Sequence, residues 1–171
     1  MMQSAADWSS GSPWRGFSAT TFSPNSTTTR AMLVTVLWRL EGAPAAGSAS
    51  TFADVEPGSW YTDAVAWAGS VGIVNGTSAT TFDPNGSVSR EQIAAILYRY
   101  AKTKGWNVNG ASSLNVFADG SQVSEWAVRS MEWTYAKGLI TGKDAGRLDP
   151  RGQASRAEVA TILMRLMESM S

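Results

Sequence analysis

Two residue types are missing from the chain, and each absence removes a class of chemistry. The 171 residues include no cysteine, which excludes disulfides, thiolate nucleophiles and zinc–thiolate sites. They include no histidine, which removes the commonest metal ligand, the commonest general base and any Ser-His-Asp triad. The sequence therefore predicts a protein that is not an enzyme, with no catalytic residues, no metal site and no cofactor.

The chain is also poor in net charge and in long apolar runs. Lys+Arg and Asp+Glu each number 14, so no net charge draws the chain toward nucleic acid or acidic lipid. No apolar run reaches the length of a membrane-spanning helix, so no membrane insertion is expected. Residues 1–10 lack the basic stretch and the apolar core of a signal peptide, so an exported form would be a piece of a longer precursor. Hydrophobic residues at 43% indicate a globular domain, and 8 tryptophans include candidates for stacking on sugars.

One pattern occurs three times along the chain. The stretches 20–40, 80–100 and 146–166 align without gaps at offsets of 60 and 66 residues. The preceding stretches 52–76 and 117–142 also match, with one inserted residue. The first unit lacks that half, so the chain holds two and a half good copies. The aligned positions carry an apolar residue, a proline and an arginine: Phe22, Phe82 and Leu148; Pro24, Pro84 and Pro150; Arg30, Arg90 and Arg156.

Each full unit is expected to begin with a short helix, over about 62–70 or 126–137. Gly72 and Gly138 follow as the left-handed stop that glycine permits. A short connector, "GIVNG" or "GLITG", and an Asp-Pro turn come next. The buried face of the first of these helices is predicted to include Ala64, Val65, Trp67, Ala68 and Val71.

The second helix of each unit has clearer signals. Hydroxyl N-caps stand at Thr29, Ser89 and Ser155, and Gln92 and Glu158 complete capping boxes in two copies. Apolar residues follow at i, i+3, i+4 and i+7. They are Leu33, Val36, Leu37 and Leu40; Ile93, Ile96, Leu97 and Tyr100; Val159, Ile162, Leu163 and Leu166. These stripes most simply pack against one another, which predicts a mainly α fold: three helix-turn-helix repeats packed as a pseudo-threefold trimer, with an incomplete first repeat and grooves between neighbours.

The repeats define the expected domain organisation. Residues 1–171 form one domain; its repeat units are 1–42 (truncated), 52–102 and 117–168, and its linkers are 43–51 and 103–116. Residues 1–15 lack the apolar period of 62–71, so we expect them to be irregular or poorly ordered.

Arginine recurs at the first position of the second helix, as Arg30, Arg90 and Arg156. A cation at this positive end of the helix dipole costs roughly 0.3–1 kcal/mol. Arginine can hold a carboxylate bidentately, and a helix start already favours anions, so the repetition favours an anionic ligand. The alternative is that each arginine lies on a carboxylate of the chain, such as Glu91, Asp54 or Asp119. A second recurring set is expected in the last helical turn, where a cation suits the dipole: Arg39, Arg99 and Arg165.

Six further residues are candidate ligand contacts, each with a structural alternative. The tryptophans can stack on a sugar ring or pack in the core. The aspartates precede turns, where they are more often caps, and no spacing brings them together as an acid–base pair. The glycines are first of all turn residues. The six are Trp60 and Trp126, Asp54 and Asp119, and Gly76 and Gly142.

The pattern "FADV…W…AV.WA…GIV.G…FDP…VSREQ…IL.R" resembles the S-layer homology domain, which usually occurs as three tandem copies. The likeness covers residues 16–168. It implies a helical pseudo-trimer of three repeats that anchors exported proteins to a bacterial cell wall without a covalent bond. The implied ligand is a secondary cell-wall polysaccharide bearing ketal-linked pyruvate, which is a carboxylate on a sugar. The family's Thr-Arg-Ala-Glu motif falls on Thr29–Met32, Ser89–Gln92 and Ser155–Glu158, and each copy keeps the arginine.

The expected function is therefore non-covalent wall anchoring through a pyruvylated polysaccharide. The resemblance implies an extracellular place at the cell wall or cell surface, as a monomeric domain of a larger surface protein. One alternative is a protein–protein or self-assembling S-layer lattice module without glycan binding, and removing pyruvate from the polymer distinguishes the two. On this view Arg90→Ala weakens wall binding, leaves the fold intact and slightly raises thermal stability.

Overall fold

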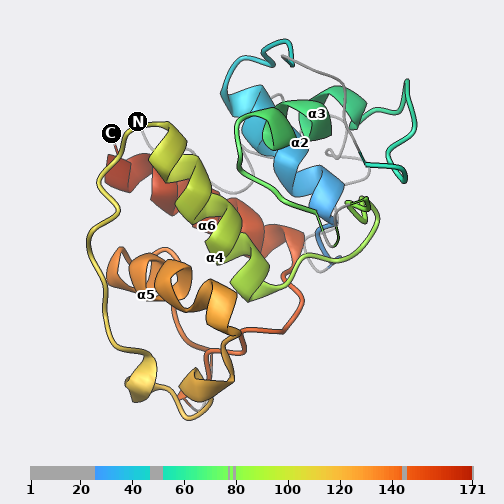
Figure 1. Cartoon of the computed structure of the whole chain (residues 1–171). Helices are drawn as coiled ribbons and strands as arrows, with labels where there is room; N and C mark the ends of the chain where they lie inside the picture. The colour runs from blue at the N-terminus through green and yellow to red at the C-terminus, as the bar shows by residue number, and fades with distance from the viewer. Residues whose placement is uncertain (1–25, 47–51, 77, 79, 144–145, 171) are drawn as a thin grey trace.

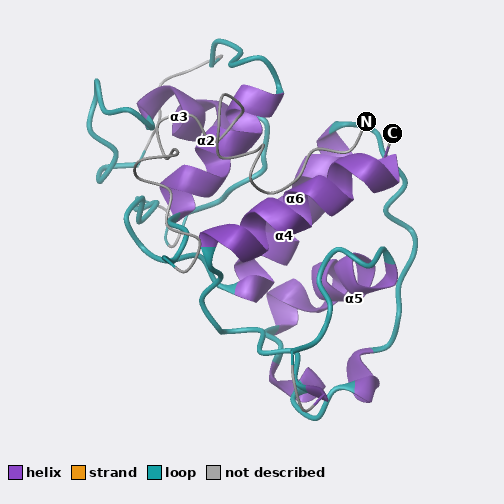
Figure 2. Cartoon of the chain, turned by 180° about the vertical axis from the view of Figure 1, so that it is seen from behind, coloured by secondary structure: helices purple, strands orange, loops and turns teal. Residues whose placement is uncertain are grey.

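A computed structural model describes residues 26–46, 52–76, 78, 80–143 and 146–170. Within these ranges the chain is mainly helical (Figure 1, Figure 2). The predictions for residues 1–15 fall outside the described part of the chain. The helices are α2 (Arg30–Leu40), α3 (Thr62–Ser70), α4 (Arg90–Thr103), α5 (Val128–Ala136) and α6 (Arg156–Met170), and the short 3₁₀ turns are η1 (Leu114–Val116), η2 (Gly120–Gln122) and η3 (Glu125–Ala127).

The predicted starts of α2, α4 and α6 are confirmed by their side-chain caps. The Thr29 hydroxyl accepts from the backbone N–H of Met32 at 3.1 Å, and the Ser155 hydroxyl accepts from that of Glu158 at 3.1 Å. Ser89 and Gln92 form the full capping box, with hydrogen bonds in both directions. Local sequence chemistry therefore places these three starts correctly.

The ends of α4 and α6 differ from the prediction. Both helices run on, to Thr103 and to Met170, so Arg99 and Arg165 do not lie in a last turn and the dipole explanation for them is wrong. Each instead extends sideways, the Arg99 Nη1 to the carbonyl of Ile73 at 3.5 Å and the Arg165 Nη1 to that of Leu139 at 3.4 Å. Among the three, only Arg39 lies in the last turn of its helix.

The first helix of each full unit ends as predicted, with Gly72 at φ 82° and Gly138 at φ 72°. Val71 was predicted to be buried and is 40% exposed, because α3 ends at Ser70 and Val71 already lies in the turn. The helix predicted over 126–137 is shorter, since Glu125–Ala127 form the separate turn η3.

One continuous apolar cluster joins all five helices. Every residue of the three predicted stripes is buried in it except Leu40, which is partly buried. Helix α2 packs against α3, and α4 packs against α5 (Figure 1). No helix within the described ranges is long and apolar enough to cross a membrane.

The segments that precede α2, α4 and α6 form a closed cycle of backbone hydrogen bonds. The N–H of Thr28 donates to Ala154, that of Ala154 to Val88, and that of Val88 to Thr28, at 3.0, 3.2 and 2.8 Å. The first N–H of each helix is likewise bonded to another repeat: Arg30 to Gly86, Arg90 to Gly152 and Arg156 to Ser26, at 2.9, 3.0 and 2.9 Å. Donors that a helix start leaves without an intrahelical partner are thereby satisfied between repeats.

Candidate functional site

Two cavities are lined by repeat-related residues. Groove 1, of about 440 Å³, is lined by Arg30, Val74, Asn75, Gly76, Gln92, Ala95, Ile96, Arg99 and Trp126. Groove 2, of about 400 Å³, is lined by Arg90, Leu139, Ile140, Thr141, Gly142, Lys143, Ala157, Glu158, Thr161, Ile162 and Arg165. Apart from Trp126, every groove 1 residue has its counterpart in groove 2 at the offset of 60 or 66 residues. The sequence repeat has therefore produced two similar cavities.

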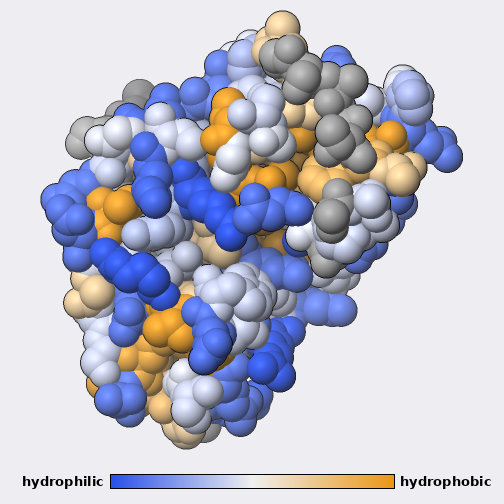
Figure 3. Space-filling model, in the orientation of Figure 1, coloured by the Kyte–Doolittle hydropathy of each residue, from blue (hydrophilic) through white to orange (hydrophobic). Residues whose placement is uncertain are grey.

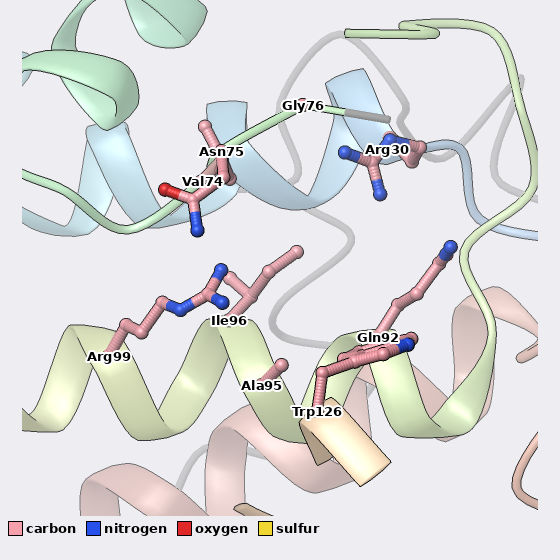
Figure 4. Close-up of a pocket in the computed structure, with 9 residues that line it drawn as sticks. All are labelled: Arg30, Val74, Asn75, Gly76, Gln92, Ala95, Ile96, Arg99 and Trp126. Carbon is pink, nitrogen blue, oxygen red and sulfur yellow. The ribbon is translucent and has the colours of Figure 1, made fainter. Parts of the chain in front are cut away.

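Each groove is assembled in the same way from two repeats. The start of a second helix supplies the first arginine, and the next repeat supplies a connector and a helix face. Figure 4 shows this in groove 1, where Arg30 of α2 faces Gln92 and Arg99 of α4 across the cavity. Trp126, from η3 of the third repeat, lies beside Gln92. Two cations and one aromatic ring thus surround a single space.

Arg30 is buried, at 6% exposure, and it is held by the turn of the following repeat. Its Nε donates to the carbonyl of Phe82 at 2.8 Å, and its guanidinium lies over the Phe82 ring at 4.8 Å. Burial lowers the pKa of Arg30, while Asp83 and Asp54 oppose that shift. Arginine stays charged in proteins, so a fixed cation forms one wall of groove 1.

Arg90 occupies the equivalent place in groove 2, at 5% exposure, and makes more bonds. Nε donates to the carbonyl of Leu148 at 2.9 Å, Nη2 to that of Thr141 at 2.6 Å, and Nη1 to Glu158 at 2.9 Å. Because the side chain joins the second repeat to the third, we expect Arg90→Ala to lower stability, in place of the slight rise expected from the helix dipole alone. The carboxylate bonded to Arg90 is that of Glu158, which is not among the three candidates named from the sequence.

Arg156 begins α6 in the same way, and its N–H donates to the Ser26 carbonyl at 2.9 Å. The turn of the first repeat, which would correspond to those that hold Arg30 and Arg90, lies outside the described part of the chain.

Asp54 and Asp119 hold the Asp-Pro turns. Asp54 accepts from the N–H groups of Phe82 and Asp83 at 2.8 and 2.7 Å, and Asp119 from those of Leu148 and Asp149 at 2.7 and 2.9 Å. For Asp119 the Leu148 bond is the main cause of a lowered pKa; for Asp54 desolvation acts against the bonds, yet the pKa is still lowered. Both oxygens of each carboxylate serve the turn that carries Phe82 or Leu148.

Gly76 and Gly142 line the grooves at points of close approach. A Cβ on Gly76 would lie 2.5 Å from the Phe52 ring and 2.5 Å from the Thr81 carbonyl, and one on Gly142 would lie 2.5 Å from the Phe117 ring. Gly76 also has φ 81°, which favours glycine. Both residues let the groove wall pass directly over an aromatic side chain.

Trp60 and Trp126 are not core residues, since they are 53% and 56% exposed. Trp126 lines groove 1, and Trp60 lies outside the two grooves. The turn that carries Trp126 is anchored by Glu91, which is 3% exposed. Its carboxylate accepts from the N–H of Ser124 at 2.9 Å and from the Ser124 hydroxyl at 2.8 Å.

Sequence reasoning missed Gln92 and Arg99 as groove residues, and Glu91 as the anchor of the turn that carries Trp126. Gln92 was read only as part of the capping box, and Arg99 only as a cation near a helix end. A helical spacing of seven places Gln92 and Arg99 on one face, so the two together carried a signal. The partner of Glu91 lies 33 residues away, and nothing local points to it. No group of three or more acidic residues that could hold a metal ion occurs within the described ranges.

Comparison with known proteins supplies the family. The model of the S-layer homology domain matches residues 51–94 and 116–160, which together make up more than half of the chain. The chain belongs to the S-layer homology domain family. The two matches contain the connectors, the second-helix starts and most of the residues that line the grooves.

Relatives of known name match across most of this S-layer homology chain. A surface-layer 125 kDa protein of Lysinibacillus sphaericus is 33% identical over 87% of the chain, which spans 12% of that protein. An amylopullulanase of Thermoanaerobacterium thermosulfurigenes is 30% identical over 90% of the chain, which spans 8% of it. A cellulosome-anchoring protein of Acetivibrio thermocellus is 27% identical over 90% of the chain, which spans 35% of it. The chain thus corresponds to a small part of each relative.

Proposed function

We propose that this domain anchors an exported bacterial protein to the cell wall by binding a pyruvylated secondary cell-wall polysaccharide. The observation that carries the proposal is the composition of groove 1. Two arginines and one exposed tryptophan surround it, and its lining residues include no carboxylate. A pyruvate ketal offers a carboxylate fixed to a sugar ring, which matches a bidentate cation beside an aromatic face.

The names of the relatives agree with an anchoring role at the cell surface. They include a surface-layer protein and a cellulosome-anchoring protein. Two others are named as enzymes, an amylopullulanase and an exoglucanase, and the chain spans only 8% and 14% of them. We take the shared part to be a non-catalytic anchor and assign their catalysis to the rest of those proteins.

We further infer that the three repeats are arranged around a pseudo-threefold axis. The closed cycle of hydrogen bonds through Thr28, Val88 and Ala154 supports this arrangement. In it, Arg156 and Trp60 would contribute to a third groove on α2. Gly76 and Gly142 would let a sugar approach the backbone, while Asp54 and Asp119 would hold the groove walls.

Calorimetry with purified pyruvylated wall polysaccharide tests the proposal. Arg99→Ala and Trp126→Ala should each weaken binding, the arginine variant by roughly tenfold or more, since a charged hydrogen bond is worth about 1.5–3 kcal/mol. Arg147→Ala is the control, because its side chain is 60% exposed and lines neither groove. Folded variants that bind as tightly as wild type would overturn the assignment of the groove.

A further inference from the structure

We propose that the two grooves are not equivalent: groove 1 takes the anionic group of the ligand, and Glu158 closes groove 2 to it. The residue pair Gln92 and Glu158, at equivalent positions of α4 and α6, would then determine which groove binds. This inference rests on the proposed function, because it assumes a carboxylate-bearing ligand.

In groove 2 the hydrogen-bond donors of the Arg90 side chain already have partners within the chain. Each of its three nitrogens donates within the chain, and Nη1 is bonded to Glu158 at 2.9 Å. An incoming carboxylate would have to displace Glu158 and then lie beside its negative charge. Lys143 also lines this groove, but its ammonium is paired with Asp149 at 2.7 Å. Two of the three cations that line groove 2, Arg90 and Lys143, are therefore paired with carboxylates of the chain, and Arg165 bonds the Leu139 carbonyl.

In groove 1 the position equivalent to Glu158 is occupied by Gln92, whose side chain is a neutral amide. The Oε1 of Gln92 accepts from the N–H of Ser89 at 3.0 Å, which leaves the amide nitrogen for the cavity side. Within the described ranges, the one hydrogen bond from the Arg30 side chain is the bond from Nε to the Phe82 carbonyl. The terminal nitrogens of Arg30 are thus available to a carboxylate, with Arg99 across the cavity (Figure 4).

The aspartates near the two arginines differ from Glu158 in how they are held. Asp83 lies close enough to influence Arg30, and its counterpart Asp149 influences Arg90. Asp54 also influences Arg30, but both of its oxygens accept from backbone N–H groups of the turn, whereas Glu158 bonds the Arg90 guanidinium directly.

Groove 1 also has an aromatic wall that is held in place. Glu91 binds both the N–H and the hydroxyl of Ser124, two residues before Trp126. Its counterparts in the other repeats are Ala31 and Ala157, which cannot make this contact. Since a preorganised wall loses less entropy on binding, groove 1 is favoured for the sugar ring as well as for the charge.

The test uses a matched pair of small probes: a hexose bearing a pyruvate ketal, and the methyl ester of the same compound, which keeps the shape and loses the charge. Wild type should bind the acid at least tenfold more tightly than the ester. Gln92→Glu should weaken binding of the acid at least tenfold and leave binding of the ester unchanged. Glutamate is also a capping-box residue, so this variant is expected to fold.

Glu158→Gln is the reciprocal variant, and it should create a second site for the acid. The guanidinium Nε–H signals of Arg99 and Arg165 report the two grooves separately in an NMR titration. In wild type only the Arg99 signal should shift, and in Glu158→Gln both should shift.

The outcomes separate this inference from the proposed function. Two results would overturn the groove assignment alone. One is equal shifts at Arg99 and Arg165 when wild type binds the acid probe, and the other is Gln92→Glu binding the acid as tightly as wild type does. Wild type that binds neither the acid probe nor the pyruvylated polymer would overturn the proposed function and the inference with it.

Discussion

At the scale of single residues, the arginines at the helix starts join repeats as well as line grooves. Arg30 and Arg90 are buried, and each donates to a carbonyl in the turn of the following repeat. Their unfavourable position relative to the helix dipole is offset by these bonds. The sequence raised two explanations, a ligand or a partner within the chain, and the structure shows that a partner within the chain is part of the answer.

Arg90→Ala is expected to lower the free energy of unfolding by about 3 kcal/mol or more, because it leaves buried carbonyls and Glu158 without their donor. Chemical denaturation measures the change. Arg151→Ala serves as the control, since its side chain is 72% exposed and its nearest acid is 3.8 Å away. Equal stability of the two variants would contradict the structural role of Arg90.

The aspartates predict a pH dependence of stability. The pKa values of Asp54 and Asp119 are lowered in the folded chain. A depressed pKa gives stability that is present above the unfolded value, about 4, and is lost as the pH falls through the folded value. The double variant Asp54→Asn, Asp119→Asn should therefore show a shallower loss of unfolding free energy below about pH 4. An unchanged slope would mean that other carboxylates control acid unfolding.

At the scale of elements, the features that could be predicted from the sequence are those set by neighbouring residues. The N-caps, the apolar stripes and the glycine stops depend on residues within a few positions of one another, and all were predicted. Two side-chain contacts could not be predicted, because the partners lie far apart in the sequence. Arg90 and Glu158 are 68 residues apart, and Glu91 and Ser124 are 33 apart. Arg99 was wrongly placed in a last turn, since α4 continues to Thr103 and ends beside the turn at Gly105, where the predicted linker begins.

The connector that carries Gly76 offers a matched pair of substitutions. Gly72 and Gly76 have nearly the same φ, 82° and 81°, but a Cβ on Gly72 meets nothing within 4 Å. Gly72→Ala should cost about 1–2 kcal/mol for the left-handed backbone alone. Gly76→Ala should cost at least about 1 kcal/mol more, because the Phe52 ring and the Thr81 carbonyl must both move. Thermal denaturation of both variants gives the difference, and equal losses would show that these neighbours move without cost.

At the scale of the whole molecule, the cycle of backbone hydrogen bonds links the three repeats, and we expect them to unfold together. Thr28, Val88 and Ala154 each donate to a different repeat. Their amide protons should therefore exchange through one common opening, with free energies close to that of global unfolding. Native-state hydrogen exchange measured by NMR tests this. Much faster exchange at Thr28 than at the other two would show that the first repeat opens on its own.

The family could also be predicted from the sequence, because several signature positions of the two full copies align, with one inserted residue. The proposed difference between the two grooves could not be predicted from the sequence, since it depends on which side chains meet. Glu158 reads as a capping-box residue in the sequence, and its contact with Arg90 is the observation from which we infer its role in groove 2.

The affinity of the domain for one wall polysaccharide, before and after mild acid removal of its pyruvate, tests the central claim most directly. Calorimetry on both samples keeps the protein and the sugar backbone constant and changes only the carboxylate. Loss of the ketal should weaken binding at least about tenfold, which corresponds to about 1.4 kcal/mol. Equal affinity for the native and depyruvylated polymers would contradict anchoring through an anionic sugar and would favour a docking surface for protein instead.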